Sequence, residues 1–325
     1  MLITGGAGFI GSHLAEMLLN QGHTVRVLDD LSTGTSANIN NLKTYRSFEF
    51  IEGSVLDRTI ISESVDWCDV VFHLAAAVGV KRVVYDPVGV INTNFETTSL
   101  VLEQAVIEKK TVLITSSSEI YGNSNQFPLK EDDNPVLGQT NNGRWSYACS
   151  KALDEFLGLA YYQQYGLPVI VVRLFNTVGP RQAGRYGMVL PRFVQQAINN
   201  LPLTVHGDGT QTRCFGHVSD VAYAISDLVK HPKAVGEVFN VGNDQRISIK
   251  ELANLVIEIC ESSSNLEFVP YDGIYEGKFD DIQHRVPDLG KIRDLIGYNP
   301  RMDLRQTIRS VFEYYSRPEA KFDIT

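Results

Sequence analysis

A glycine-rich turn near the start of the chain is the feature that most restricts its fold. The segment Gly5–Gly11 follows the short apolar run Met1–Thr4 and precedes a helical pattern over Ser12–Asn20. In such a turn the first glycine permits tight backbone geometry, the second lets the backbone approach a pyrophosphate, and the third lets helix and strand pack closely. Free N–H groups at the helix start can bind phosphate oxygens. The turn therefore predicts a dinucleotide-binding unit.

Two acidic residues identify which dinucleotide this unit would bind. Asp29 and Asp30 follow the apolar run Thr24–Leu28, about 20 residues beyond the turn, where the acidic residue of such sites is found. A carboxylate there accepts a hydrogen bond from the ribose 2′-OH and repels a 2′-phosphate. We therefore expect NAD rather than NADP.

Apolar runs alternate with helical patterns over the first half of the chain. Val70–Leu74, Val112–Thr115 and Val169–Leu174 are predicted strands. Helices are predicted between them, at Asn94–Lys110 and Tyr147–Tyr165. This alternation is typical of a parallel sheet covered on both faces, so the predicted fold class is α/β, a doubly wound parallel Rossmann sheet.

The pattern changes beyond about residue 179, where turn residues become frequent. Helical stretches at Val189–Asn199 and Ile249–Cys260 are separated by short strands. We predict an NAD-binding domain over residues 1–178 and a smaller α/β nucleotide-sugar-binding lobe over residues 179–325. Some later segments are expected to return to the first domain.

Composition excludes several classes of function. The net charge of −9 and the lack of a basic tract argue against a nucleic-acid partner. No stretch has the ~18 apolar residues of a membrane helix, and a turn beginning at Gly5 leaves no room for a secretory signal. The four cysteines match no zinc spacing, so no metal is expected and the thiols fit a reducing cytoplasm.

A tyrosine and a lysine four positions apart are the candidate catalytic pair. Tyr147 and Lys151 lie on one face of a predicted helix. A lysine ammonium stabilises phenolate and should lower the tyrosine pKa toward working pH. A phenolate can remove a hydroxyl proton while hydride leaves the same carbon. Ser117 follows a predicted strand, where ligands bind in doubly wound sheets, and can hydrogen-bond the reacting oxygen.

With these motifs the chain resembles extended short-chain dehydrogenases/reductases, in particular the NAD-dependent nucleotide-sugar epimerase/dehydratase family. The resemblance covers nearly the whole chain, and UDP-glucuronate decarboxylases and UDP-sugar 4-epimerases are the most similar members. Further motifs that carry it are His73-Leu74-Ala75-Ala76, Arg173-Leu174-Phe175-Asn176, Gly179-Pro180-Arg181 and Gly207-Asp208-Gly209. It implies a homodimer through a four-helix bundle formed by the helices Asn94–Lys110 and Tyr147–Tyr165.

The resemblance also implies a set of site residues. Catalytic roles fall on Ser117, Glu119, Tyr147, Lys151 and Arg285. Cofactor contacts fall on Gly5, Gly8, Phe9, Ile10, Gly11, Asp29, Asp30, Ser32, Gly34, Ser54, Val55, Leu74, Ala75, Ala76, Asn94, Tyr147 and Lys151. Ser54 stands where many relatives have an acidic residue near the adenine. Substrate contacts fall on Lys81, Ser118, Arg144, Asn176, Val189, Leu203, Val205, Arg213 and Arg285.

The family shares one first step, oxidation of the sugar at C4, and its members differ in the later steps. Glu119 matches the catalytic glutamate of the decarboxylases, Arg285 lies in a segment similar to the one that carries their catalytic arginine, and Gly143-Arg144-Trp145 precedes the tyrosine as in a bacterial decarboxylase. The resemblance therefore favours decarboxylation of UDP-glucuronate to a UDP-pentose or its 4-keto form. Arg285 would then hold the carboxylate or stabilise the enolate.

Other residues keep a second reaction open. The segment 181–189 looks more like that of bacterial 4-epimerases, and the tyrosine-lysine segment lacks the pattern of eukaryote-like UDP-xylose synthases. A UDP-sugar or UDP-uronate 4-epimerase is the alternative, and a sugar 4,6-dehydratase is less favoured because Ser118 precedes Glu119 where dehydratases have an aspartate. An NAD-binding regulator without catalysis would be expected to lack the tyrosine or the lysine, and both are present.

Overall fold

The computed structural model describes residues 1–184, 188–270 and 282–317, apart from the side chains of Val80, Lys81, Val84 and Arg144. A seven-stranded sheet, parallel throughout, forms its centre in the order β11-β6-β5-β4-β1-β2-β3. The predicted doubly wound parallel sheet is therefore confirmed. Its strands are β1 (Leu2–Thr4), β2 (Val25–Asp29), β3 (Phe48–Glu52), β4 (Val70–His73), β5 (Thr111–Ser117), β6 (Val169–Leu174) and β11 (Val238–Val241).

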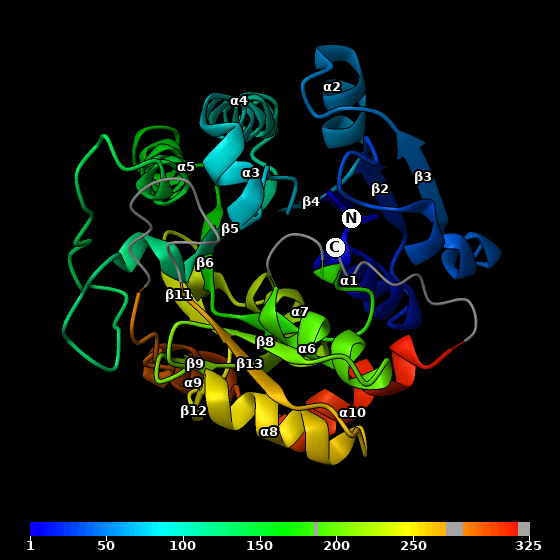
Figure 1. Ribbon diagram of the computed structural model, residues 1–325. Helices are drawn as coiled ribbons and strands as arrows, with labels where there is room; N and C mark the ends of the chain where they lie inside the picture. Colours follow the sequence, from blue (N-terminus) through cyan, green and yellow to red (C-terminus); the bar gives the residue numbers. More distant parts are fainter. Residues whose placement is uncertain (185–187, 271–281, 318–325) are drawn as a thin grey trace.

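Helices cover both faces of this sheet (Figure 1). Successive residues of a strand point to opposite faces, and Leu2 and Ile3 of β1 enter two different buried clusters. One cluster packs against α1 (Phe9–Asn20), α7 (Val218–Leu228) and α9 (Gly290–Ile296). The other packs against α2 (Arg58–Trp67), α4 (Pro87–Ala105) and α5 (Arg144–Tyr165). Because both faces are buried, the strands are continuous apolar runs, which the sequence pattern detects readily.

A second layer of structure lies beside the sheet. It contains the helices α6 (Val189–Ile198), α8 (Ile249–Ile259) and α10 (Leu304–Tyr315), which share a third buried cluster. Paired short strands complete it: β7 (Thr177–Val178) with β10 (Gly216–His217), β9 (Thr212–Cys214) with β12 (Arg246–Ser248), and β8 (Leu203–His206) with β13 (Leu266–Val269). The short helix α3 (Val80–Tyr85) and the single turns η1 (Ser36–Asn38), η2 (Asn40–Thr44), η3 (Ser118–Tyr121) and η5 (Pro232–Ala234) lie in connections.

The bounds of α4 differ from the sequence prediction of Asn94–Lys110. The helix begins at Pro87 because the Asp86 carboxylate accepts the Gly89 N–H, and proline is favoured in the first helical turn. It ends at Ala105, five residues early, and Lys109 adopts a left-handed backbone conformation in the turn beyond it. No helix among the described residues is long and apolar enough to cross a membrane.

Candidate active site

A cavity of about 620 Å³ lies at the carboxyl ends of the strands of the large sheet. Its walls come from the segments that follow β1 through β6 and, on the other side, from the second layer. This is the edge where doubly wound sheets bind ligands. Most of the residues predicted from the sequence line it: Gly5, Gly8, Phe9, Ile10, Gly11, Asp29, Asp30, Ser32, Ser54, Val55, Leu74, Ala75, Ala76, Ser117, Ser118, Glu119, Tyr147, Lys151, Asn176, Val189, Arg213 and Arg285.

The glycine turn fits a bound pyrophosphate. Gly5 has φ +70°, and a Cβ there would lie 2.7 Å from the backbone nitrogen of Ala75. A Cβ on Gly11 would lie 2.4 Å from the Gly5 carbonyl oxygen, so only glycine lets α1 approach the turn this closely. The N-cap Gly8 provides no side-chain acceptor for the first N–H groups of α1. These groups are left for an anionic ligand in the cavity.

Asp29 and Asp30 differ in what they contact. The buried Asp29 carboxylate accepts the N–H of Ala7 at 2.9 Å through one oxygen and that of Leu31 at 2.8 Å through the other. Burial nevertheless raises the pKa of Asp29. Asp30 is exposed at the cavity wall and accepts the Ser32 N–H. Asp29 therefore fixes the glycine turn, while Asp30 presents its carboxylate at the surface.

The proposed catalytic residues meet in the middle of the cavity. Ser117 ends β5, and its hydroxyl accepts the Glu119 N–H at 3.2 Å and hydrogen-bonds the Tyr147 hydroxyl. Tyr147 lies in the first turns of α5, with Lys151 one turn further along. The spacing thus brings a hydroxyl, a phenol and an ammonium to one wall, as the sequence predicted.

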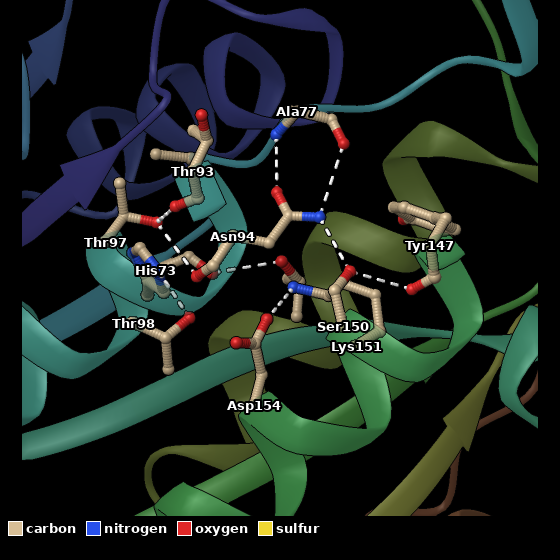
Figure 2. Close-up of polar contacts among 12 residues, drawn as sticks. His73, Ala77, Thr93, Asn94, Thr97, Thr98, Tyr147, Ser150, Lys151 and Asp154 are labelled. Atoms are coloured by element: carbon tan, nitrogen blue, oxygen red, sulfur yellow. Dashed lines mark hydrogen bonds and ion pairs between the residues drawn. The ribbon is translucent and has the colours of Figure 1, made fainter. Parts of the chain in front are cut away.

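The pKa of Tyr147 shifts in the direction opposite to the sequence prediction. Burial raises it, and the nearby carboxylates of Glu119 and Asp154 raise it further, against the hydrogen bond from Ser117. The lysine does not offset these effects. The Nζ of Lys151 donates to Oδ2 of Asp154 at 2.7 Å, so its charge is compensated within α5 (Figure 2).

Glu119 and Arg285 form an ion pair at the cavity wall. The Arg285 Nη1 lies 2.6 Å from Glu119 Oε1, and the side chains of Arg285 and Glu119 are only 12% and 20% exposed. Arg285 is therefore not a solvent-exposed arginine. Its Nε is buried and has no hydrogen-bond partner among the described residues. An arginine with an unused donor can bind a carboxylate through two nitrogens.

A group of polar residues lines the cavity on the side of the second layer. The buried Arg213 donates to the carbonyl oxygens of Thr212 and Gln283. Arg192 of α6 contacts His206 Nε2 at 3.0 Å, and Gln211 donates to the His206 carbonyl. Arg192, His206 and Gln211 were not predicted from the sequence. A cationic wall of this kind suits a diphosphate.

Four predicted site residues lie elsewhere. Leu203 and Val205 are fully buried in the core of the second layer, because the alternation along β8 places His206, not these two, toward the cavity. Gly34 lies outside the cavity lining, and a Cβ there would meet the backbone of Ala7 at 2.9 Å. The fourth residue is Asn94.

Asn94 does not line the cavity. It hydrogen-bonds residues of two neighbouring segments instead (Figure 2). Its Oδ1 accepts the Ala77 N–H at 2.7 Å, and its Nδ2 donates to the hydroxyl of Ser150 at 3.1 Å. It thereby connects the segment after β4 to α5. The side chains of Lys81 and Arg144 lie outside the described residues, so their predicted substrate contacts remain predictions.

Comparison with known proteins places this geometry in a family. The model of the GDP-mannose 4,6 dehydratase family matches residues 2–311. A UDP-N-acetyl-alpha-D-glucosaminuronate decarboxylase of Bacillus cytotoxicus is 40% identical over 98% of both chains. UDP-glucuronic acid decarboxylase 1 of Danio rerio is 34% identical over 98% of this chain and 72% of its own length.

Solved structures agree. A UDP-glucuronic acid 4-epimerase of Bacillus cereus, in complex with UDP-glucuronic acid and NAD, has a TM-score of 0.86 and 29% identity, with 96% of this chain and 98% of that one covered. A UDP-glucose 4-epimerase of Thermus thermophilus, in complex with NAD, has a TM-score of 0.83 and 27% identity over 97% and 98% of the two chains. As the sequence resemblance predicted, the chain belongs to the GDP-mannose 4,6 dehydratase family of nucleotide-sugar enzymes.

Proposed function

We propose that this protein is an NAD-dependent UDP-uronate decarboxylase. The ion pair between Glu119 and Arg285, beside Ser117, Tyr147 and Lys151 in one cavity, carries the proposal. A simple 4-epimerase needs no carboxylate at the position of Glu119, whereas a uronate needs a group that holds its carboxylate. The 40% identity to a uronate decarboxylase supports the same reaction.

NAD is the proposed cofactor, since the turn at Gly5 and Gly11 and the N-terminus of α1 fit a pyrophosphate and an acidic residue lies at the end of β2. Bound NAD would supply the hydride acceptor. Tyr147 would accept the proton of the C4 hydroxyl, with the Ser117 hydroxyl holding that oxygen. Burial, Glu119 and Asp154 raise the pKa of Tyr147, so for Tyr147 to act as the base the Ser117 hydroxyl and the Lys151 ammonium would have to stabilise the phenolate against these effects.

Oxidation at C4 makes the sugar carboxylate β to a ketone. The bond between C5 and the carboxyl carbon then breaks, CO₂ leaves, and the electron pair enters the ketone as an enolate. Arg285 would bind the carboxylate through its unused Nε and stabilise the charge that develops. Glu119 would orient Arg285 and take part in reprotonation of C5. The product is a 4-keto pentose, or a UDP-pentose if the hydride returns.

The experiment is incubation of the purified protein with UDP-glucuronate and, separately, with UDP-N-acetylglucosaminuronate, followed by mass and NMR analysis of the products. Release of CO₂ with a UDP-pentose or its 4-keto form from either compound is expected. The sequence favours UDP-glucuronate, and the 40% identical relative favours the N-acetylated uronate. Tyr147→Phe should abolish turnover. Unchanged turnover in that variant would contradict the proposal.

A UDP-uronate 4-epimerase is the second candidate, because a structure of that activity superposes over 96% of this chain. Conversion of UDP-glucuronate to UDP-galacturonate without CO₂ would establish it. Interconversion of UDP-glucose and UDP-galactose, with no reaction of either uronate, would contradict both candidates.

We further propose that the protein is a cytoplasmic homodimer. The four cysteines are free thiols, which suits a reducing compartment. Apolar side chains are exposed on one stretch of α4, at Val88, Ile91 and Phe95, and on the adjacent α5, at Leu153 and Phe156. The two helices pack side by side (Figure 1). Exposed apolar residues on two adjacent helices support the four-helix arrangement expected from the sequence.

A further inference from the structure

A buried carboxylate lies beneath the catalytic lysine and has no part in the proposed reaction. Asp154 and Lys151 are one turn apart on α5, and their side chains are 0% and 3% exposed. Building such a pair is costly, because both ions lose their hydration. With Lys151 in place, an apolar residue at 154 would leave the buried ammonium without a counter-charge. The carboxylate at this position is therefore explained by the lysine that it neutralises.

A chain of buried hydrogen bonds runs beside Asp154. Asp154 Oδ1 has no hydrogen-bond partner among the described residues, and close to its carboxylate lies the hydroxyl of Thr98 on α4 (Figure 2). That hydroxyl lies 3.2 Å from His73 Nε2, and His73 Nδ1 lies 2.8 Å from the hydroxyl of Thr4. Thr4 directly precedes the glycine turn and accepts the Ala75 N–H. The chain therefore runs from the cofactor-binding end of the cavity to the neighbourhood of Asp154.

The direction of these hydrogen bonds is set by the chemistry of their ends. An ionised carboxylate only accepts, so a Thr98 hydroxyl turned toward Asp154 would donate to it. Thr98 would then accept from His73, which would place the imidazole proton on Nε2 and leave Nδ1 to accept from Thr4. Burial and the nearby Lys151 lower the pKa of His73 to about 3, which keeps the ring neutral and limits it to one proton. In this arrangement the donors along the chain all point toward Asp154.

We propose that Asp154 is the positioning residue of the catalytic lysine. Its carboxylate, with the hydroxyl of Thr98 close by, fixes the Lys151 ammonium at the cavity wall as half of a neutral pair. Asp154 thereby holds the buried ammonium in place for its part in the reaction at Tyr147. That part rests on the proposed function, whereas the positioning itself does not.

Several other charged or titratable groups lie around Lys151 and Asp154, and they would contribute to the pH dependence of turnover. On α5 these are Tyr147 and the neighbouring Glu155, from β4 comes His73, and from η3 comes Glu119. α4 contributes the hydroxyl of Thr98, and Arg82 of α3 lines the same cavity. Glu155 is itself bound to Arg173 at 2.8 Å, so its charge is compensated separately.

The test is Asp154→Asn, which keeps the shape but removes the charge. In protein with ¹³C-labelled lysine side chains, the Lys151 signal, assigned with Lys151→Met, is expected to lose its proton at a pH at least about one unit lower than in the wild type. Turnover of the UDP-uronate near neutral pH should fall at least about tenfold with little change in KM, and its alkaline limb should move to lower pH. An unchanged Lys151 titration would overturn the proposal.

Two further variants keep the test decisive if Asp154→Asn does not fold. Thr98→Val removes the hydroxyl beside Asp154 and should shift the Lys151 titration in the same direction by a smaller amount. Ser99→Ala is the matched control, because that hydroxyl, on the next residue of α4, contacts Glu103 instead. Equal titrations in the two variants would also overturn the proposal.

The NMR measurements need no substrate, so they separate this proposal from the proposed function. If neither uronate reacts, the Lys151 titration still decides the role of Asp154. In ¹⁵N spectra the wild-type His73 should show the Nε2–H tautomer, and the opposite tautomer would contradict the hydrogen-bond direction on which the positioning depends.

Discussion

Arg285 and Glu119 are separated by 166 positions in the chain and meet at 2.6 Å. Because Arg285 is proposed to bind the sugar carboxylate, Arg285→Ala should reduce turnover of the uronate by about 100-fold, the scale of losing one charge-stabilising donor. NAD affinity, measured by titration calorimetry, should change less than about twofold, since the substrate and not the cofactor is the predicted ligand.

The control for this prediction is Arg293→Ala. Arg293 is an exposed arginine of α9 that pairs with Asp244. Both turnover and NAD affinity should stay near the wild-type values in this variant. Equal losses of turnover and NAD affinity in Arg285→Ala would instead assign Arg285 a structural role.

His73 gives a pH dependence of stability. Its pKa falls from the ordinary 6.5 to about 3 in the fold, because burial and Lys151 disfavour the charged ring. The unfolded chain therefore binds one more proton than the native protein between these values. The contribution of the neutral His73 ring to the free energy of unfolding is fully present above about pH 6.5. It is lost as the pH falls toward 3, by about 1.4 kcal/mol per pH unit.

Replacing the ring tests this directly. In His73→Gln, the free energy of unfolding measured by urea denaturation should depend less steeply on pH between 6 and 4, by about one proton. His231→Gln, at a histidine whose side chain is 38% exposed beside Asp227, is the control for the loss of a histidine outside the core. The same slope in His73→Gln and the wild type would show that His73 is not buried in its neutral form.

At the scale of elements, the junction of β1, the turn and α1 depends on Gly11. A Cβ there would lie 2.4 Å from the Gly5 oxygen and 2.7 Å from the Gly6 Cα, both in backbone that cannot yield easily. Gly11→Ala should therefore lower the free energy of unfolding by about 1–3 kcal/mol, the usual cost of overpacking. NAD binding should weaken as well, because α1 must move away from the turn.

Gly143→Ala is the matched control for Gly11→Ala. A Cβ on Gly143 would meet no atom of the described residues within 4 Å, and its φ of −57° suits any residue. Its melting temperature, measured by scanning calorimetry, should equal that of the wild type. If Gly11→Ala melted at the same temperature too, the close approach of α1 to the turn would be wrong.

Elements also show which parts of the fold the sequence could predict. β6 matches its predicted bounds because it is a continuous apolar run, buried on both faces. α4 was placed seven residues late, because its start depends on the cap at Asp86 and not on apolar periodicity. In β8 the periodicity identified two apolar residues, but only the position of the neighbouring cavity determines that His206 faces it.

Ion pairs between distant elements could not be predicted from the sequence. Each member of the Glu119–Arg285 pair was predicted as a site residue from resemblance, but their contact was not. The Lys151–Asp154 pair is local, yet its burial depends on the surrounding elements. Burial of the phenol, followed by Glu119 and Asp154, reversed the expected shift in the Tyr147 pKa. The sequence motifs thus predict which residues form the site, while burial in the surrounding core determines the pKa values of their side chains.

At the scale of the whole molecule, the exposed face of α4 and α5 predicts self-association. Phe156 is 72% exposed and lies one turn from Leu153. Because a two-fold interface repeats each contact, Phe156→Glu would place two carboxylates in an apolar contact, where unpaired charges are strongly unfavourable. We expect the wild type to sediment as a dimer at micromolar concentration and Phe156→Glu as a monomer with an intact fold.

Phe268→Glu is the control for the interface. Phe268 is 47% exposed on β13, in the second layer and away from α4 and α5 in Figure 1. This variant should sediment like the wild type, since it adds the same charge at a similarly exposed aromatic residue outside the proposed contact. A monomeric wild type would contradict the proposed dimer. A dimer that Phe156→Glu leaves intact while Phe268→Glu dissociates it would place the interface elsewhere on the molecule.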